Sequence, residues 1–237
     1  MTKRIPCGAI ALAVALFFVS HAARAGEIHY NAREGILPGV DAILAADPTQ
    51  IELRDESGST PLVVAADNGH QNVVERLLAK GANLNARNSR GETALFDAVN
   101  RRYTEIATLL ISREANVNIG NKEGETPLHL AADMDQAGLV SLLLTNKANP
   151  NAKNVLGFTP LHYAIHRDSM PIVEAMLAFK ADVTIPIDIA KWAAIRNRSN
   201  ITHMLRYFHP FYMASPLSLA QYYGHTEIAD LLKKKPK

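Results

Sequence analysis

Histidine side chains are the first candidates for chemistry in this chain of 237 residues. Beyond residue 25 there are eight, His29, His70, His129, His162, His166, His203, His209 and His225. His129 and His162 each follow a Pro-Leu pair and are 33 residues apart, so they occupy equivalent places in a repeating unit. Equivalent side chains in stacked units lie about 10 Å apart, whereas zinc ligands lie about 2.0 Å from the metal. This spacing argues against a shared metal ion.

No motif of a catalytic centre accompanies the histidines. The sequence has no nucleophile elbow, no phosphate-binding glycine-rich loop and no His-Glu-x-x-His run. Its carboxylates are scattered along the chain, and no pair is placed to face another across a cleft. We therefore expect no enzyme activity, no catalytic residue, no cofactor and no metal.

The first twenty-five residues have the pattern of a secretory signal peptide. Lys3 and Arg4 precede an apolar stretch over residues 9–19, and small residues at positions 23 and 25 stand ahead of Gly26. A membrane anchor is the alternative, but crossing the bilayer takes roughly 20 apolar residues, and this stretch is shorter. We expect cleavage after Ala25 and no stable membrane insertion.

The overall charge changes when this segment is removed. The whole chain has 25 basic and 23 acidic residues, a formal charge of +2, and a pI near 8.6. Loss of Lys3, Arg4 and Arg24 leaves 22 basic against 23 acidic residues, a net charge of −1, and the only cysteine goes with them. Several of the remaining lysines lie in a short basic tail, residues 233–237. This distribution excludes a disulfide framework and gives no support for nucleic-acid binding.

Four segments that align without gaps reveal the elements that carry these side chains. Their shared glycines are spaced 33 residues apart, at Gly58, Gly91, Gly124 and Gly157, and each is followed two residues later by a threonine. Each threonine can cap a helix, and the proline that follows three of them suits the first helical turn. A fixed period of this length indicates stacked supersecondary units.

These segments resemble the ankyrin repeat. Residues 126–132 read Thr-Pro-Leu-His-Leu-Ala-Ala, residues 69–78 match the second helix of that family, and residues 81–85 match its closing loop. The resemblance implies an all-α fold, an ankyrin-repeat solenoid of paired antiparallel helices with β-hairpin fingers and about seven units including caps. It also implies that His129 and His162 form hydrogen bonds to neighbouring loops.

The period sets the expected boundaries. A single ankyrin-repeat domain spans 26–232, with an N-terminal cap at 27–54 and full repeats at 55–87, 88–120, 121–153 and 154–186. Degenerate repeats follow at 187–214 and 215–232, where the period shortens. Two turns that have glycine in the first full repeat, at Gly69 and Gly81, have other residues later. We expect a left-handed backbone there, at Arg102, Glu114, Asp135, Lys147, Asp168 and Lys180.

Ankyrin-repeat proteins generally bind other proteins with the fingers and the exposed edge of the first helices. Carried onto this chain, the resemblance predicts a partner-binding set of Arg90, Glu92, Arg101, Lys122, Glu123, Met134, Val155, Leu156, Phe158, His166 and Arg167. Apolar residues 155, 156 and 158 on one finger favour an interface anchor. The alternative is that this finger folds down onto the C-terminal cap. The aromatic segment 207–212 poses the same choice, and there we favour cap packing.

The resemblance and the signal peptide together predict a monomeric protein-interaction module in the periplasm of a Gram-negative bacterium, with an unidentified, periplasmic protein partner. Small exported proteins of this kind are associated with protection against oxidative stress, which favours a scaffold that supports a partner enzyme. Others are encoded beside secreted toxins, so an immunity protein that blocks an effector enzyme is the alternative.

Overall fold

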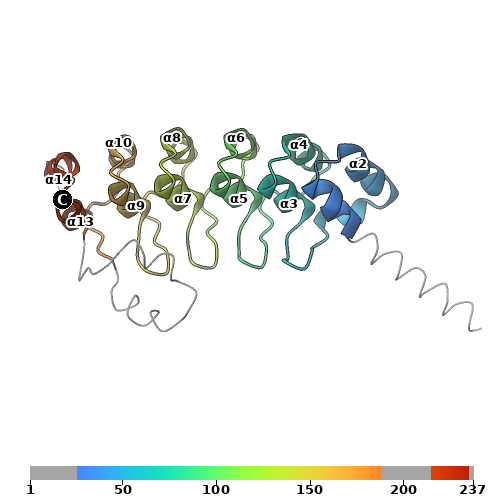
Figure 1. Ribbon diagram of the computed structural model, residues 1–237, viewed down its shortest axis with the longest axis horizontal. Coiled ribbons are helices and arrows are strands. Elements are labelled where there is room, and N and C mark those ends of the chain that lie inside the picture. Colours follow the sequence, from blue (N-terminus) through green and yellow to red (C-terminus); the bar gives the residue numbers. More distant parts are fainter. Residues whose placement is uncertain (1–25, 188–214, 235–237) are drawn as a thin grey trace, which may run out of the picture. The chain divides into compact units, whose positions relative to one another are not determined.

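The computed structural model describes residues 26–187 and 215–234 of the chain. The chain divides into two compact units, residues 1–89 and residues 90–237. Every described element is a helix, and no β-strand occurs within 26–187 or 215–234. The prediction of an all-α fold is therefore confirmed for the part of the chain that the structure describes (Figure 1).

The first unit contains a helical segment over residues 26–33 and four further elements. These are α2 (Leu37–Ala46), the 3-10 helix η1 (Pro48–Glu52), α3 (Pro61–Asp67) and α4 (Gln71–Ala79). α2 and α3 both contact η1 and α4. Fully buried Ile28, Ala32 and Val40 form the apolar interior of the N-terminal part, and Val73 and Leu77 that of α4.

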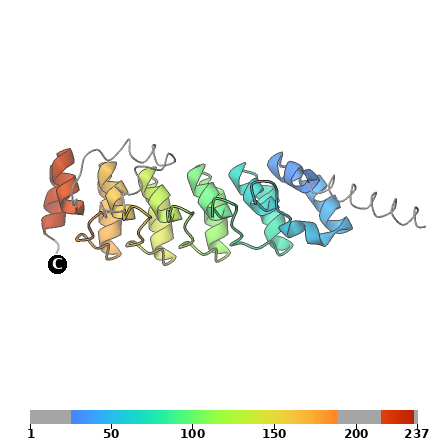
Figure 2. The same cartoon turned by 90° about the horizontal axis from the view of Figure 1, so that it is seen from below.

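The second unit is built from four helix pairs. They are α5 (Ala94–Asn100) with α6 (Thr104–Ser112), α7 (Pro127–Asp133) with α8 (Ala137–Thr145), α9 (Pro160–His166) with α10 (Met170–Ala178), and α13 (Pro216–Tyr223) with α14 (Thr226–Lys233). The first helices contact one another in the order α5, α7, α9, α13, and the second helices in the order α6, α8, α10. Figures 1 and 2 show these two rows.

Small and capping residues explain why the helices of the second unit stack closely. Ala98, Ala131 and Ala164 occupy equivalent places on α5, α7 and α9, and all three are completely buried. Each first helix begins after a threonine or serine; Thr93 Oγ1, for example, accepts a hydrogen bond from Phe96 N at 3.2 Å. The caps satisfy helix amides that would otherwise lack partners, and the alanines let neighbouring backbones approach.

The expected left-handed positions are confirmed. Arg102, Glu114, Asp135, Lys147, Asp168 and Lys180 all have positive φ angles, between 54° and 67°. Their equivalents in the first full repeat, Gly69 and Gly81, have φ angles of 80° and 90°. The turns keep one conformation through these repeats, although glycine, the residue that favours it, is replaced at six of these positions.

The fingers differ from the expected β-hairpins. Each is a hydrogen-bonded loop without an assigned strand, closed by backbone bonds such as Asn121 N to Glu125 O (2.9 Å) and Asn154 N to Phe158 O (3.0 Å). Gly58 at a finger tip has a φ angle of 73°, and a Cβ atom there would lie 2.5 Å from Ser89 Oγ. A tight turn and a close neighbour both require glycine at this place.

The last helix pair adjoins α9 directly. α13 contacts α9 just as α9 contacts α7 and α7 contacts α5. The degenerate repeat predicted for 187–214, including the aromatic segment 207–212, lies outside the described residues apart from Ile187. The segment 1–25, for which a signal peptide is predicted, and the end of the basic tail (235–237) also lie outside them.

Candidate partner-binding surface

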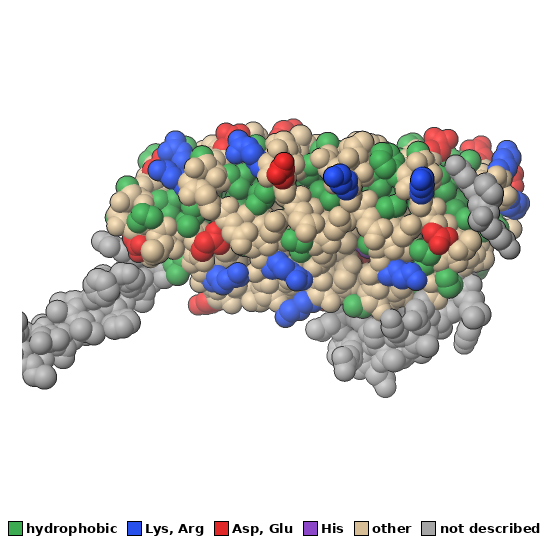
Figure 3. Space-filling view, turned by 180° about the vertical axis from the view of Figure 1, so that it is seen from behind, with side chains coloured by type: hydrophobic (Ala, Val, Ile, Leu, Met, Phe, Trp, Pro, Cys, Tyr) green, Lys and Arg blue, Asp and Glu red, His purple; other side chains and the backbone are tan. Residues whose placement is uncertain are grey.

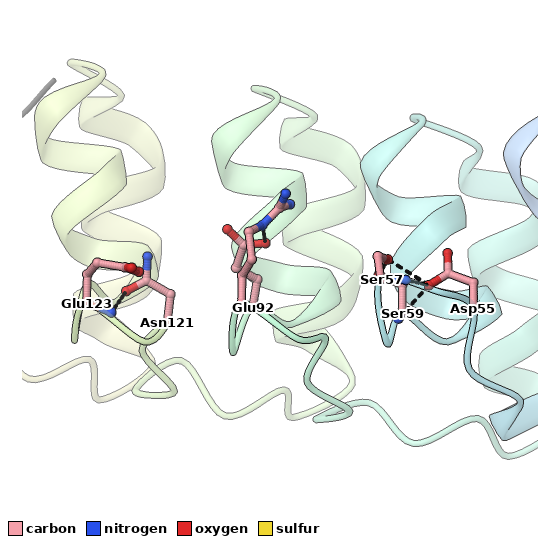
Figure 4. Close-up of polar contacts among 7 residues, drawn as sticks. Asp55, Ser57, Ser59, Glu92, Asn121 and Glu123 are labelled. Carbon is pink, nitrogen blue, oxygen red and sulfur yellow. Dashed lines mark hydrogen bonds and ion pairs between the residues drawn. The ribbon is translucent and has the colours of Figure 1, made fainter. Parts of the chain in front are cut away.

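The finger loops owe their shape to one side chain at the start of each loop. Asp55 Oδ1 accepts hydrogen bonds from Ser57 N (2.9 Å), Ser57 Oγ (2.6 Å) and Ser59 N (2.9 Å). Asn121 Oδ1 accepts from the backbone amide of Glu123 at 3.0 Å, which Figure 4 shows, and from that of Glu125 at 2.9 Å. Asn154 Oδ1 accepts from the amides two and four residues later, at 3.0 Å each. These bonds hold the tips of the loops in one conformation in the unbound protein.

Sequence reasoning missed this role of Asp55, Asn121 and Asn154. The sequence does contain a pattern that indicates this role, because an Asp or Asn recurs every 33 residues, at positions 55, 88, 121 and 154. Short polar side chains of this kind commonly bond their own backbone two residues later in turns.

Neighbouring finger tips are also joined through the backbone. Lys122 N donates to Arg90 O at 2.9 Å, and Val155 N donates to Glu123 O at 2.8 Å, both within the second unit. In the first unit Ser89 N donates to Ser57 O at 2.9 Å. The tips of adjacent fingers therefore lie side by side, and their side chains form a continuous edge within each unit.

The predicted binding residues on the first two fingers of the second unit are partly exposed. Lys122 and Glu123 are exposed at the tip of their loop. Arg90 is exposed as well, and its Nε lies 2.5 Å from Glu92 Oε2. Glu92 itself is only 9% exposed, so the prediction that it faces a partner is wrong: its carboxylate lies at the base of the loop, where Figure 4 also shows it.

The apolar finger is a clear correction. Leu156 and Phe158 are each 1% exposed, and the expectation that they form an exposed anchor is wrong. The Phe158 ring lies 5.9 Å from the His162 ring and 6.0 Å from the Tyr163 ring, so it belongs to the interior around α9. Val155 lies in the same loop, where its backbone N–H donates to Glu123 O of the preceding finger, and this residue remains 37% exposed. Burial removes from water the apolar area that the loop would otherwise expose.

The helix-edge residues that were predicted to bind occur at the ends of the first helices. Arg101 and Arg167 are exposed, and Met134 and His166 are half-buried. Arg167 contacts Asp133 Oδ1 through Nε at 3.1 Å and Nη2 at 3.0 Å. That two-pronged contact fixes the direction of the guanidinium group, although at this exposure it adds little stability.

His129 has the hydrogen-bonding role that the resemblance implied. Its Nδ1 accepts from Thr126 N at 3.1 Å, and its Nε2 donates to Phe158 O, in the next finger, at 3.1 Å. Burial lowers the pKa of His129 to about 4, although the bond to the Phe158 carbonyl opposes that shift. The ring is therefore neutral near pH 7 and ties a first helix to the following finger.

A second link between finger and helix involves Tyr163. Its hydroxyl donates to Glu125 Oε1 at 2.6 Å and accepts from Asn154 Nδ2 at 3.1 Å. Burial raises the pKa of Tyr163 well above its ordinary value, and the negative charge of Glu125 adds to that shift. Sequence reasoning did not identify this network, because the three residues are spread over two repeats.

The first unit offers a surface that sequence reasoning also missed. A cavity of about 600 Å³ lies between the helical segment 26–33 and the first finger, and Tyr30, Arg33, Arg54 and Glu56 are among its lining residues. Tyr30 is 58% exposed. Tyrosine and arginine are side-chain types enriched at protein interfaces.

Two other kinds of site are absent from residues 26–187 and 215–234. No group of three or more His, Cys, Asp or Glu side chains in these ranges is arranged to hold a metal ion. None of the helices there is both long and apolar enough to cross a bilayer. On the face drawn in Figure 3, basic side chains are scattered among acidic ones.

Comparison with known proteins gives a family match. A model of the family described as ankyrin repeats (3 copies) matches residues 28–121 and 113–187, which together cover more than half of the chain. Acyl-CoA-binding domain-containing protein 4 of Oryza sativa subsp. japonica is 46% identical over 52 residues. These residues are 22% of this chain and 15% of that protein, so the chain spans only a small part of the relative's length.

Proposed function

The chain belongs to the ankyrin-repeat family, whose repeats are protein–protein interaction modules, and from that premise we propose that it binds a protein partner without catalysing a reaction. The ankyrin-repeat family is generally non-catalytic. The binding residues that we assign are the exposed members of the predicted set: Arg90, Arg101, Lys122, Glu123, Val155 and Arg167, with Met134 and His166 half-buried beside them.

The finger loops provide the observation that carries this proposal. Asn121 holds its loop through two backbone hydrogen bonds, and the loop then presents Lys122 and Glu123 to solvent. A loop that is already ordered loses little conformational entropy on binding, which favours affinity. Exposed charges of both signs contribute more to the choice of partner than to the strength of binding.

The place of action follows from the signal peptide predicted at residues 1–25. We propose that the mature chain begins at Gly26, acts as a monomer in the periplasm and serves as a scaffold that supports a partner enzyme under stress. Cell fractionation followed by N-terminal sequencing tests the location. A full-length chain in the cytoplasm would contradict it.

Site-specific photo-crosslinking tests the binding surface. A photoreactive amino acid at position 122, on a finger, is compared with one at position 147, an exposed lysine at the turn after α8. We expect the periplasmic partner to crosslink from position 122 and not from position 147. Equal crosslinking from both, or crosslinking from position 147 alone, would refute the assignment of the surface.

The partner's activity then distinguishes the two roles. A scaffold leaves the activity of the captured enzyme intact when purified mature protein is added. An immunity protein abolishes it at a one-to-one ratio. The second result would replace the scaffold role with inhibition of an effector enzyme, while leaving the binding surface as assigned.

A further inference from the structure

The last helix pair is attached to α9 through a cluster of ionisable and aromatic side chains. This terminal cluster consists of His166 at the end of α9, Asp168 in the following turn, Tyr223 at the end of α13 and His225 before α14. The His166 and Tyr223 ring centroids are 5.3 Å apart, and those of Tyr223 and His225 are 5.5 Å apart with the rings stacked. His225 Nδ1 lies 3.0 Å from Asp168 Oδ1.

Two of these contacts, between His166 and Tyr223 and between His225 and Asp168, cross the boundary between repeats. His166 and Asp168 belong to the repeat of α9 and α10, whereas Tyr223 and His225 belong to the last pair, α13 and α14. His166 provides one of the contacts that cross this boundary, to Tyr223, and His225 provides the other, to Asp168. The attachment of the last helix pair to the preceding repeat therefore includes two imidazole rings.

The surroundings of His166 oppose its charged form. Burial lowers the pKa of His166, the nearby Arg167 lowers it further, and the proximity of His225 acts in the same direction. Asp133 at the end of α7 opposes this shift, but its carboxylate is also in contact with Arg167. Tyr223 is the neighbouring side chain from α13, and burial raises its pKa, so it remains uncharged near pH 7.

His225 contributes a hydrogen-bonded contact to the cluster. In the neutral ring, Nδ1–H donates to Asp168, whose side chain is 62% exposed and whose charge is therefore screened by water. Nε2 is buried and has no hydrogen-bond partner among the described residues.

We propose that the terminal cluster is a pH-sensitive contact that docks the last helix pair at neutral pH and loosens it in acid. Protonation of His166 places a new cation beside Arg167 and against the stacked rings of Tyr223 and His225. A group whose pKa is lower in the folded state than in the unfolded state stabilises the fold above the unfolded value and loses that effect as the pH falls. For histidine this loss begins near pH 6.5.

Loosening of the last helix pair would also change the exposed surface of the protein. Tyr222 is 57% exposed, and its ring lies 5.5 Å from the Tyr223 ring in an edge-to-face arrangement. Loosening of α13 changes the position of Tyr222, which lies on the helix next to α9, the helix whose end carries the assigned residues His166 and Arg167. Acidification would thus alter one end of the exposed edge and leave the fingers in place.

Hydrogen exchange at pH 7.5 and pH 5.5 tests the proposal. After correction for intrinsic exchange rates, we expect the protection factors of α13 and α14 amides to fall at pH 5.5 by up to about tenfold. A tenfold decrease is the largest effect expected of one imidazole whose pKa is about 6.5 when the helix pair is undocked and which stays neutral when it is docked. Amides of α5 should change much less. Equal protection of α13 at both pH values would overturn the proposal.

Two variants separate this cluster from other histidines. His166→Gln should remove most of the pH response of α13, whereas His70→Gln, which changes a histidine in the first unit, should retain it. Retention of the full response in His166→Gln would overturn the assignment. NMR titration of His166 in the unmodified protein gives an independent check in case the variant fails to fold: a pKa at or above 6.5 contradicts the proposal.

Discussion

Truncation of Phe158 decides whether the third finger of the second unit is interior or interface. The side chain is 1% exposed and lies against the rings of His162 and Tyr163, so Phe158→Ala leaves a cavity as well as losing apolar burial. Such substitutions cost about 3–5 kcal/mol. The total free energy of unfolding of a domain is about 5–15 kcal/mol, so this loss would be a large part of it.

The matched control lies in the same loop. Val155 is 37% exposed, and Val155→Ala should change the free energy of unfolding by no more than about 0.5 kcal/mol. Equilibrium urea unfolding followed by far-UV circular dichroism measures both variants, and an unchanged m value would show that the unfolded state is not altered. A loss below about 1 kcal/mol for Phe158→Ala, together with impaired partner binding, would refute the burial argument and restore this residue to the interface.

Two further predictions concern backbone strain and acid sensitivity. Lys147→Gly should stabilise the protein by up to about 1 kcal/mol, because the φ angle of Lys147 is 67° and glycine adopts such an angle without strain. Lys80→Gly is the control: φ there is −89°, so this change should destabilise the protein by a similar amount. Urea unfolding measures the free energy of unfolding of both variants. The pKa of His129, about 4 against 6.5 when unfolded, predicts a loss on the order of 3 kcal/mol as the pH falls from 6.5 to 4. His129→Gln should flatten this part of the stability profile, and an equally steep profile in that variant would contradict the linkage.

The local conformation of the repeats could be predicted from residue type. Threonine before proline indicates where a first helix begins, and the alanine five residues after each of these threonines indicates close helix contact, as the complete burial of Ala131 and Ala164 shows. Even the six left-handed positions followed from comparing each repeat with the one that has glycine. These features depend on a few neighbouring residues, so one sequence contains the necessary information.

Exposure on the fingers could not be predicted in the same way. Leu156, Phe158 and Val155 are all apolar and lie within four residues, yet only Val155 is exposed. Which of them is buried depends on the path of the loop, which Asn154 sets, and on the rings of His162 and Tyr163 that receive Phe158. Hydrophobicity identifies residues that avoid water, but it does not distinguish an interior from a partner's surface.

The neighbour of the last helix pair could not be predicted from the sequence either. The chain leaves the regular period after Ile187 and resumes it at Ser215, so sequence spacing suggested one more repeat between α10 and α13. That repeat lies outside the described residues, and the spacing did not predict that α13 contacts α9. Gln136 Nε2 reaches back to Val99 O at 3.1 Å, and His225, at the equivalent turn, reaches back to Asp168 at 3.0 Å. Neighbours in a repeat stack are defined by complementary surfaces, and the spacing of residues along the chain does not specify those surfaces.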